Sequence, residues 1–572
     1  MPWWDLWDWG QSRLECELDA LRDAGISFEQ DSEERARGRL VLLLEYPLDG
    51  KPCKILARFP EFYPYARIEL IAPDLNLQHH QNPVAKNLCV FARHSDAWLP
   101  SDTLCSVLQE RLPLVIASAK SNDQQWLSTI EVRQAEPVTD YFSYQPESYL
   151  LIDSAWALGA AQDGRLKIGF NARPKSIALR GAVLEIKDHH GTILARADDA
   201  IRRAYCEKTI DADWYRVQSP PIIRNPDELK TLDRERCSKV NPARVSDGSV
   251  RVAALVFPEE REWRIAAGDG YLFLVRAPHG VRYARKGRKT SHLGYLARAV
   301  RLGQGDFFSR APELTPLAEK RIAVVGVGCV GAPSALEFAK AGLKELRLVD
   351  GDAVDAGNSL RWPLGIAAAG TFKVDALEGF IRANFPRTSV QKWNHRIGDA
   401  FAPQESKFLE LLEGVDLLYD ATAEPGIQYL LSELARRSRI PYVWVSATQG
   451  GWGGRVARTR PGSSDACWSC VQAAETSGEI PPPPGRTGEP VQPVGCASPT
   501  FTGANFDIME VALCAVRLAV STLCYGTNGG YPDPGWNVGV LRIRSAMGEL
   551  GSPVWTSHRV ECKAECAARN EL

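Results

Sequence analysis

The sequence predicts a multidomain α/β protein, and three of its features indicate this fold class. A chain of 572 residues exceeds the length at which one hydrophobic core stops growing, so several domains are expected. Residues 1–145 show the helix, hairpin and helix order of an α+β domain. Strand and helix patterns alternate through residues 301–572, which predicts a parallel sheet covered by helices on both faces. Residues 146–300 mix strand-like runs with polar turns and indicate a connecting domain of mixed structure.

Composition and charge exclude several classes of partner. Hydrophobic residues make up 45% of the chain and charged residues 24%, which is typical of a globular protein. Lys and Arg (68) nearly balance Asp and Glu (70), so no global basic field favours nucleic acid or a membrane surface. The chain begins without the pattern of a secretion signal and has no long apolar run, so we expect a cytoplasmic protein. The 14 cysteines then indicate reduced thiols, metal ligands or catalysts.

The N-terminal domain is expected to begin with an amphipathic helix, because Leu14, Leu18 and Leu21 recur at helical spacing. A hairpin and a third strand follow, and a second helix begins at Ser101 as a candidate N-cap. The expected helices and strands cover residues 7–23, 39–46, 53–59, 67–72 and 101–116. The polar, irregular stretch at residues 78–99 predicts a functional loop.

This order of elements, together with Phe59-Pro-Glu-Phe-Tyr-Pro64, Cys89 and Trp98-Leu-Pro100, resembles the ubiquitin-conjugating enzymes over residues 1–125. In that family the cysteine carries a thioester, which implies that role for Cys89. A His-Pro-Asn element precedes it there, and its asparagine stabilises the oxyanion during aminolysis. Here His79 has the family spacing to the cysteine, but Gln81 stands where the asparagine is expected and Asn82 is the nearest asparagine. Either amide could serve the oxyanion, and a structural role for both stays open.

The C-terminal half contains a glycine motif between a strand and a helix. Gly326, Gly328 and Gly331 form G-x-G-x-x-G directly after a hydrophobic run. Glycines allow the backbone to approach a polyphosphate, and the helix N-terminus offers free N–H groups. Asp350 follows at the end of the next predicted strand, about twenty residues later, where an acid can bind ribose hydroxyls. Alone, this motif would favour a nicotinamide-dependent dehydrogenase.

Polar residues further along the chain favour adenylate formation instead. Attack of a carboxylate on the α-phosphorus of ATP builds negative charge, which requires cations and carboxylate-bound Mg²⁺. Arg361 and Lys373 can supply the cations. Asp420 ends a predicted strand and offers the hard oxygen ligand that Mg²⁺ prefers.

Residues 300–570 resemble the ThiF/MoeB/ubiquitin-activating adenylation family, whose Rossmann-like domain carries these features in the same order. The resemblance implies ATP and Mg²⁺ as cofactors. The matching residues are Gly326, Gly328, Gly331, Asp350, Asp352, Asn358, Arg361, Lys373 and Asp420. Family members usually form dimers in which the partner's N-terminal extension donates an arginine, which implies a homodimer here. Arg310 is the candidate for that arginine.

Two cysteine pairs predict a structural zinc site. Cys467 and Cys470 are spaced as C-x-x-C, and Cys562 and Cys566 lie near the end of the chain. Four thiolates can form a closed tetrahedral Zn²⁺ site. The adenylation family often carries C-x-x-C at both places, and the second pair departs from it by one residue.

A proline- and glycine-rich segment, residues 477–490, predicts a crossover loop that leads to Cys496. A cysteine on such a segment, near a helix N-terminus, could attack an acyl adenylate as thiolate. Its position in the family's crossover region implies that Cys496 accepts the first thioester. A buried structural thiol is the alternative.

The combination of a conjugating-type and an activating-type domain resembles the bacterial fusion proteins of CBASS antiphage operons. That resemblance implies a donor with a free C-terminal carboxylate, a cGAS-like nucleotidyltransferase, and transfer of its acyl group to a lysine or other amine. Two other interpretations stay open: a sulfur-carrier adenylyltransferase of the thiamin or molybdopterin type, and an inactive nucleotide-binding scaffold.

Overall fold

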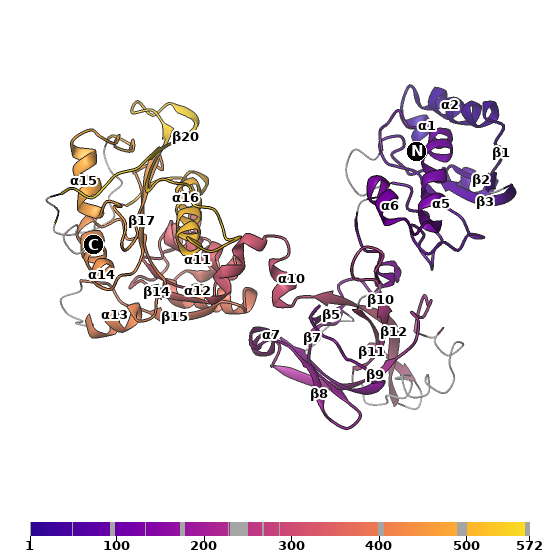
Figure 1. The fold of residues 1–572 in the computed structure, drawn as a ribbon, viewed down its shortest axis with the longest axis horizontal. Coiled ribbons are helices and arrows are strands. Elements are labelled where there is room, and N and C mark those ends of the chain that lie inside the picture. Colours follow the sequence, from indigo (N-terminus) through magenta and orange to yellow (C-terminus); the bar gives the residue numbers. More distant parts are fainter. Residues whose placement is uncertain are drawn as a thin grey trace. The chain divides into compact units, whose positions relative to one another are not determined.

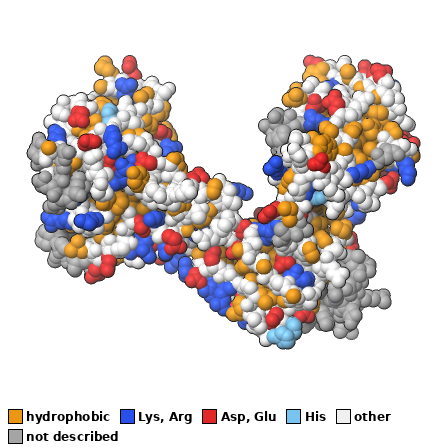
Figure 2. Space-filling model, in the orientation of Figure 1, with side chains coloured by type: hydrophobic (Ala, Val, Ile, Leu, Met, Phe, Trp, Pro, Cys, Tyr) orange, Lys and Arg blue, Asp and Glu red, His pale blue; other side chains and the backbone are white. Residues whose placement is uncertain are grey.

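The fold was analysed in a computed structural model that describes residues 2–48, 50–91, 98–131, 133–171, 178–226, 228, 250–265, 268–284, 287–398, 405–488, 500–564 and 566. The chain forms two compact units (Figure 1). Unit 1 comprises residues 1–197 and 205–302, and unit 2 comprises residues 198–204 and 303–572. None of the described helices is long and apolar enough to cross a membrane. Lys and Arg side chains are interspersed with Asp and Glu over the surface that Figure 2 shows, as the balanced composition predicts.

The first part of unit 1 is the predicted α+β domain. Its four-stranded antiparallel sheet has the order β1-β2-β3-β4. Its elements are α1 (Trp3–Leu6), α2 (Gly10–Asp23), β1 (Ser27–Gln30), α3 (Ser32–Ala36), β2 (Val41–Leu48), β3 (Lys51–Arg58), β4 (Glu69–Ile71), α4 (Leu104–Ser106), the π-helix η2 (Val107–Arg111), α5 (Leu112–Lys120), α6 (Gln124–Ile130) and the 3₁₀ helix η3 (Val138–Tyr141). Alternate residues of β2 and β3, such as Leu42, Leu44, Ile55 and Ala57, are fully buried under the helices.

Two predicted helix boundaries in this domain were wrong. The expected helix over residues 7–23 is α2, which begins only at Gly10, and the separate short helix α1 precedes the predicted range. The later helix is capped by Thr103, not by Ser101: Thr103 Oγ1 accepts a hydrogen bond from Ser106 N (3.1 Å), and Ser106 Oγ accepts one from Thr103 N (3.0 Å). This reciprocal capping box satisfies two backbone groups at once, which a single cap at Ser101 would not do.

The connecting domain of mixed structure is a β-barrel. Its strands follow the order β5-β12-β11-β10-β9-β6-β7-β8, and a parallel pairing of β5 with β7 closes the sheet on itself. The elements are β5 (Tyr149–Ile152), β6 (Asp163–Phe170), β7 (Arg180–Asp188), β8 (Ile193–Arg196), β9 (Lys208–Arg216), β10 (Arg251–Glu259), β11 (Gly268–Ala284) and β12 (Gly287–Arg301). The helix α7 (Asp199–Ala204), between β8 and β9, belongs to unit 2. Closure leaves the seven strands of the ring without a free edge, and β8 adds to β7 outside the ring.

Unit 2 confirms the predicted doubly wound sheet. The parallel strands lie in the order β15-β14-β13-β16-β17, and the antiparallel strands β18-β19-β20 extend the sheet. Its elements are α10 (Gln304–Phe308), η4 (Pro312–Glu319), β13 (Arg321–Val325), α11 (Gly331–Lys340), β14 (Glu345–Val349), η5 (Ala356–Leu360), η6 (Ile366–Ala368), α12 (Lys373–Asn384), β15 (Ser389–Trp393), α13 (Glu405–Leu412), β16 (Leu417–Asp420), α14 (Pro425–Arg437), β17 (Tyr442–Ala447), β18 (Gly453–Thr459), α15 (Trp468–Thr476), α16 (Asn505–Leu523), β19 (Val538–Arg544) and β20 (Leu550–His558).

The helices of unit 2 cover both faces of the sheet. Helices α11, α12 and α16 share a core with one face, and α13, α14 and α15 share a core with the other (Figure 1). The residues from Ile322 to Val325 are therefore all buried, as expected for a parallel strand enclosed on two sides. The carboxyl ends of β13, β14 and β16 meet at one edge, where the glycine motif lies.

Candidate active sites

The glycine motif forms the turn between β13 and α11. Gly326 has a φ of 81°, and a Cβ there would lie 2.9 Å from the Ala421 backbone. A Cβ on Gly331 would lie 1.9 Å from the carbonyl oxygen of Gly326. A Cβ on Gly328 would meet no atom within 4 Å, so this position faces open space. Packing therefore requires two of the three glycines, and the third leaves room for a ligand to approach the backbone.

The acidic pair and the predicted lysine lie together beside this turn. Asp350 Oδ2 accepts a hydrogen bond from Val327 N (2.9 Å) in the glycine turn, and its Oδ1 accepts one from Asp352 N (2.8 Å). Lys373 Nζ lies 2.8 Å from Asp352 Oδ2 and 3.8 Å from Asp350 Oδ1. These groups line a cavity of about 240 Å³ with Gly326 and Gly328. The structure thus brings a phosphate-binding turn, two acids and a cation to one place.

Asn358 and Arg361 also lie near the glycine turn, although they do not line this cavity. Asn358 lies in η5, and its carbonyl oxygen accepts a hydrogen bond from Arg361 N (2.9 Å). The adjacent Trp362 donates from Nε1 to the carbonyl oxygen of Val327 (2.9 Å), which fixes the segment of Asn358 and Arg361 to the glycine turn. Burial raises the pKa of the Cys329 thiol in the turn, and the charges of Arg361 and Lys373 partly offset that increase. Arg310 is exposed just after α10.

Asp420 lies at the carboxyl end of β16, as predicted, but its side chain is fully buried. Oδ1 accepts hydrogen bonds from Thr422 N (2.9 Å) and Oγ1 (2.8 Å), and Oδ2 accepts one from Tyr442 (2.6 Å). Burial raises the pKa of Asp420 to about 6. A carboxylate with these three partners does not fit the predicted role of Mg²⁺ ligand. The acid in this segment that lines the cavity is Glu424.

The four predicted metal ligands converge in unit 2. The sulfur atoms of Cys467, Cys470, Cys562 and Cys566 all lie within 4.8 Å of one another. The Cys467–Cys566 and Cys470–Cys562 sulfur distances are both 3.7 Å. A tetrahedral Zn²⁺ with Zn–S bonds of about 2.3 Å places its sulfurs about 3.8 Å apart. Donor type and spacing therefore both fit Zn²⁺, and the one-residue departure in the second pair does not prevent convergence.

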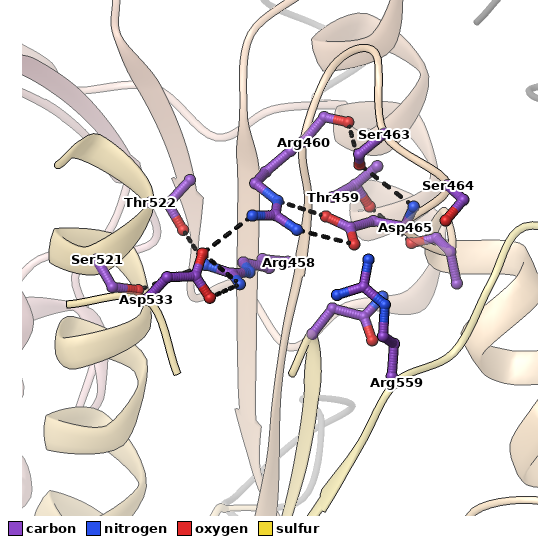
Figure 3. A network of polar contacts seen from close by, with 12 residues as sticks. Arg458, Thr459, Arg460, Ser463, Ser464, Asp465, Ser521, Thr522, Asp533 and Arg559 are labelled. Carbon is purple, nitrogen blue, oxygen red and sulfur yellow. Dashed lines mark hydrogen bonds and ion pairs between the residues drawn. The ribbon is translucent and has the colours of Figure 1, made fainter. Parts of the chain in front are cut away.

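An ion-pair network holds the two cysteine segments in place (Figure 3). The fully buried Arg458 donates to both oxygens of Asp533 (2.8 and 3.0 Å). Arg460 joins Asp533 (3.0 Å) to Asp465 (2.8 Å). Asp465 forms a β-bridge with Glu561, so the residues just before Cys467 and just before Cys562 are fixed to each other. Such supporting contacts orient metal ligands.

Cys89 is exposed and lines a second cavity, of about 680 Å³, in unit 1. Its backbone N–H donates to the carbonyl oxygen of His80 (2.7 Å). The other lining residues come from residues 67–70 at the start of β4, from the loop residues 80 and 87–91, from η2 and α5, and from residues 130–141 at and beyond the end of α6. An accessible thiol in a cavity with charged walls is a suitable place for acyl transfer.

His80, and not the predicted His79, lines this cavity. Its Nδ1 lies 2.8 Å from Glu136 Oε1, and its Nε2 lies 2.6 Å from Glu131 Oε1. Burial alone would lower the pKa of His80, but the two carboxylates outweigh it and raise the pKa. His79 Nδ1 lies 3.5 Å from Glu260 instead, and burial lowers its pKa. His80 therefore favours the imidazolium form.

The side chains of Gln81 and Asn82 form hydrogen bonds with nearby backbone groups. Gln81 is buried, donates to the carbonyl oxygen of Ala72 (2.9 Å) and accepts from Leu77 N (2.9 Å). Asn82 Oδ1 accepts from Val84 N (2.8 Å) and from the next backbone N–H (2.9 Å). These contacts give both residues a structural role, and an oxyanion role for either stays a prediction. Cys496 lies outside the described residues.

Comparison with known proteins places these two sites in two families. Residues 19–151 match the Prokaryotic E2 family B, and residues 305–506 match the ThiF family. The uncharacterized protein y4qC of Sinorhizobium fredii (strain NBRC 101917 / NGR234) is 31% identical over 588 residues, which cover 98% of this chain and 97% of y4qC. This chain belongs to the y4qC family. The uncharacterized protein y4oA of the same strain is 28% identical over 596 residues, covering 99% and 97% of the two chains.

Two further similarities of this y4qC-family chain each cover less than half of it. The adenylyltransferase and sulfurtransferase uba4 of Aspergillus clavatus is 30% identical over 225 residues, which cover 38% of this chain and 42% of uba4. The crystal structure of E. coli MccB with ATP matches with a TM-score of 0.33 and 15% identity, covering 45% of this chain and 68% of MccB. The ThiF family domain and the Prokaryotic E2 family B domain together support ATP-dependent activation and conjugation of the ubiquitin-like type.

Several site residues of this y4qC-family chain were not predicted from its sequence. In the nucleotide cavity they are His395, Arg396, Thr422 and Glu424, and in the Cys89 cavity they are His80, Glu131, Glu136 and Tyr141. Thr422 and Glu424 directly follow a predicted strand end, which is a usable signal. Glu136 and Tyr141 lie in a segment without a motif, so only the fold reveals them.

Proposed function

We propose that this protein activates the C-terminal carboxylate of another protein with ATP and transfers the acyl group through its own cysteines to an amine. The carboxylate would attack ATP at the glycine turn and release pyrophosphate. The acyl group would then pass from AMP to Cys496, from Cys496 to Cys89, and finally to a lysine. We assign these steps to domains at residues 301–572 and 1–145, which residues 146–300 connect.

The observation that carries this proposal is the presence of both reaction centres on one chain. The nucleotide cavity combines Gly328, the Asp350–Asp352 pair and Lys373, which is the chemistry that adenylation needs. The second cavity exposes Cys89, which is the chemistry that a thioester carrier needs. Joining two carriers on one chain raises their effective concentration for acyl transfer.

Metal ions have two roles in this proposal. Mg²⁺ would neutralise the phosphates of ATP, and Asp350, Asp352 and Glu424 offer the hard oxygen ligands that suit it. Zn²⁺ would hold the chain end against unit 2 through the four-cysteine cluster.

The proposed setting is bacterial antiphage defence. The domain combination resembles the CBASS fusion proteins, so we propose a cGAS-like nucleotidyltransferase as the donor of the C-terminal carboxylate and a cytoplasmic location. We further propose a homodimer in which Arg310 of one protomer serves the nucleotide site of its partner.

Thioester formation tests this proposal. The purified chain is incubated with ATP, Mg²⁺ and the product of the neighbouring open reading frame, and adducts are separated with and without reducing agent. We expect adducts sensitive to reducing agent at Cys89 and Cys496, no adduct in Lys373→Ala, and final conjugates absent from Cys89→Ala. Cys16→Ala is the matched control, because Cys16 is an exposed cysteine of the same domain. Conjugates formed by Cys89→Ala would contradict the proposal.

The similarity to uba4 favours one alternative, a sulfur-carrier adenylyltransferase. Such an enzyme would form the adenylate but would not need Cys89. Pyrophosphate exchange with a sulfur-carrier protein, unaffected by Cys89→Ala and without any amide-linked product, would support it.

A further inference from the structure

Tyr141 belongs to a segment beyond the four-stranded sheet, yet it reaches Cys89. It ends the short helix η3 and lines the same cavity as the cysteine. Its hydroxyl donates to Glu136 Oε2 (3.3 Å). Burial raises the pKa of Tyr141, and the neighbouring Glu136 and Cys89 side chains raise it further. A hydroxyl can accept one hydrogen bond while it donates another. The Cys89 thiol, the Tyr141 hydroxyl and the Glu136 carboxylate therefore line one cavity, where the hydroxyl bonds to the carboxylate and interacts with the thiol.

Glu136 is held in the form that accepts a proton. Its Oε1 pairs with His80 Nδ1 (2.8 Å), and its Oε2 accepts from His80 N (2.7 Å). Burial would raise the pKa of Glu136, but the charge and hydrogen bonds of His80 outweigh it and lower the pKa. The side chain is still 20% exposed toward the cavity, so an amine can reach it.

A residue of the barrel domain also holds these side chains in place. Arg264, between β10 and β11, donates to Glu131 Oε1 (2.5 Å) and Oε2 (3.1 Å). Glu131 in turn holds Nε2 of His80 (2.6 Å). Burial opposes the charge of Glu131, but Arg264 and His80 lower its pKa to about 2. His80 and Arg264 both have positive φ, 62° and 57°, which is uncommon for residues other than glycine and typical of functional sites.

We propose that Tyr141 is a catalytic residue of acyl transfer from Cys89, and that it relays a proton between Glu136 and the sulfur. This inference rests on the proposed function of Cys89. The amine nitrogen attacks the thioester carbon, the C–N bond forms and the C–S bond breaks. The amine reacts in its neutral form, so a protonated lysine first releases one proton to water. Glu136 then takes a proton from the attacking nitrogen, Tyr141 gives its proton to the departing Cys89 sulfur, and Glu136 returns a proton to Tyr141. The products are an amide and the Cys89 thiol, with every proton accounted for.

The test loads Cys89 without ATP, so that it does not depend on adenylation. The full chain is treated with a short peptide thioester of mercaptoethanesulfonate, and the peptide on Cys89 is quantified by mass spectrometry, with Cys89→Ala as the blank. The loaded protein is then exposed at pH 7 to lysine, which is protonated, or to hydroxylamine, which is neutral. The variants are Tyr141→Phe and Glu136→Gln. Tyr144→Phe is the matched control, because its hydroxyl donates to the carbonyl oxygen of Thr139 (2.6 Å) within the same segment.

We expect Tyr141→Phe to slow discharge to both amines by at least about tenfold, because protonation of the leaving sulfur is lost. Glu136→Gln should also slow discharge to both amines, because each attacking nitrogen must give up a proton to Glu136. Tyr144→Phe should discharge at the wild-type rate. Wild-type discharge rates in Tyr141→Phe would overturn the proposal.

A second measurement applies if Cys89 of Tyr141→Phe does not accept the peptide from the thioester. Alkylation of Cys89 by iodoacetamide at pH 7.5 should then fall several-fold in this variant, because the thiol has lost its proton acceptor. An unchanged alkylation rate at Cys89 would equally overturn the proposal. Because neither measurement uses ATP, a failure of the adenylation proposal is recognised separately.

Discussion

Asp420 illustrates how a single carboxyl group can be built into a sheet. Its oxygens accept three hydrogen bonds, from Thr422 and from Tyr442, and its side chain has no exposed surface. Burial in a low-dielectric interior disfavours the charged form and raises the pKa to about 6. The residue therefore links the end of β16 to β17 and sets the position of the segment that lines the nucleotide cavity.

The raised pKa of Asp420 predicts a pH-dependent contribution to stability. The folded state binds this proton more tightly than the unfolded state, whose Asp pKa is about 3.9. The contribution is therefore complete below about pH 4 and is lost as the pH rises through about 6, a change of about 3 kcal/mol. Asp420→Asn should remove this dependence, since the amide does not titrate. Its oxygen can still accept from Thr422, and its NH2 group must then donate to Tyr442. Urea unfolding of unit 2, followed by pulsed hydrogen exchange at peptides of β16 and β17, measures it.

Asp416→Asn provides the control for this measurement, because Asp416 precedes the same strand and is 29% exposed. Its unfolding free energy should follow the wild-type pH dependence. Identical pH profiles for Asp420→Asn and the wild type would show that Asp420 does not titrate as described.

At the scale of elements, the turn between β13 and α11 separates two uses of glycine. Gly331 packs against the Gly326 carbonyl oxygen, and Gly328 faces open space. The first is needed for the turn to close and the second for a ligand to approach. The same substitution should therefore impair folding at Gly331 and ligand binding at Gly328.

We predict that Gly331→Ala lowers the melting temperature of unit 2 by several degrees, because backbone must move to admit the new Cβ. Gly328→Ala should melt at the wild-type temperature but lose the stabilisation that ATP confers on the wild type. Calorimetry with and without ATP distinguishes the two. Equal melting temperatures for both variants would refute the packing argument, and full stabilisation of Gly328→Ala by ATP would refute the binding argument.

The cysteine cluster joins two elements far apart in the sequence, the N-terminus of α15 and the segment after β20. We predict one Zn²⁺ per chain by elemental analysis and its loss in Cys470→Ser, with a lower melting temperature for unit 2. Cys514→Ser is the control, because Cys514 is equally buried but lies in α16, outside the cluster. Unchanged zinc content in Cys470→Ser would contradict the site.

At the scale of the whole molecule, sequence patterns predicted those parts of the fold that depend on residues close together in the sequence. Alternating strands and helices predicted unit 2, because each buried strand is a hydrophobic run that its own sequence displays. The cysteine pairs predicted their own cluster, since each pair is a local motif. The barrel was not predicted, because its closure depends on pairing of β5 with β7, and β12 with β5, across long stretches of sequence.

The same reasoning explains which site residues the sequence revealed. Cys89 and Lys373 lie in motifs and were predicted. The burial of Asp420 depends on Tyr442 in the next strand, so its position was predicted and its surroundings were not. The raised pKa of His80 depends on Glu131 and Glu136, which lie beyond residues 1–125, where the resemblance to the ubiquitin-conjugating enzymes ends.

The contact between Arg264 and Glu131 indicates that the barrel domain does more than connect the two ends of the chain. A mere spacer could be exchanged for any other segment of the same span. This barrel could not, because Glu131 is only 7% exposed and would keep a buried charge with its guanidinium partner gone. The charges around Cys89 thus depend partly on Arg264, which lies more than a hundred positions further along the chain. The site around Cys89 is therefore complete only with the barrel attached.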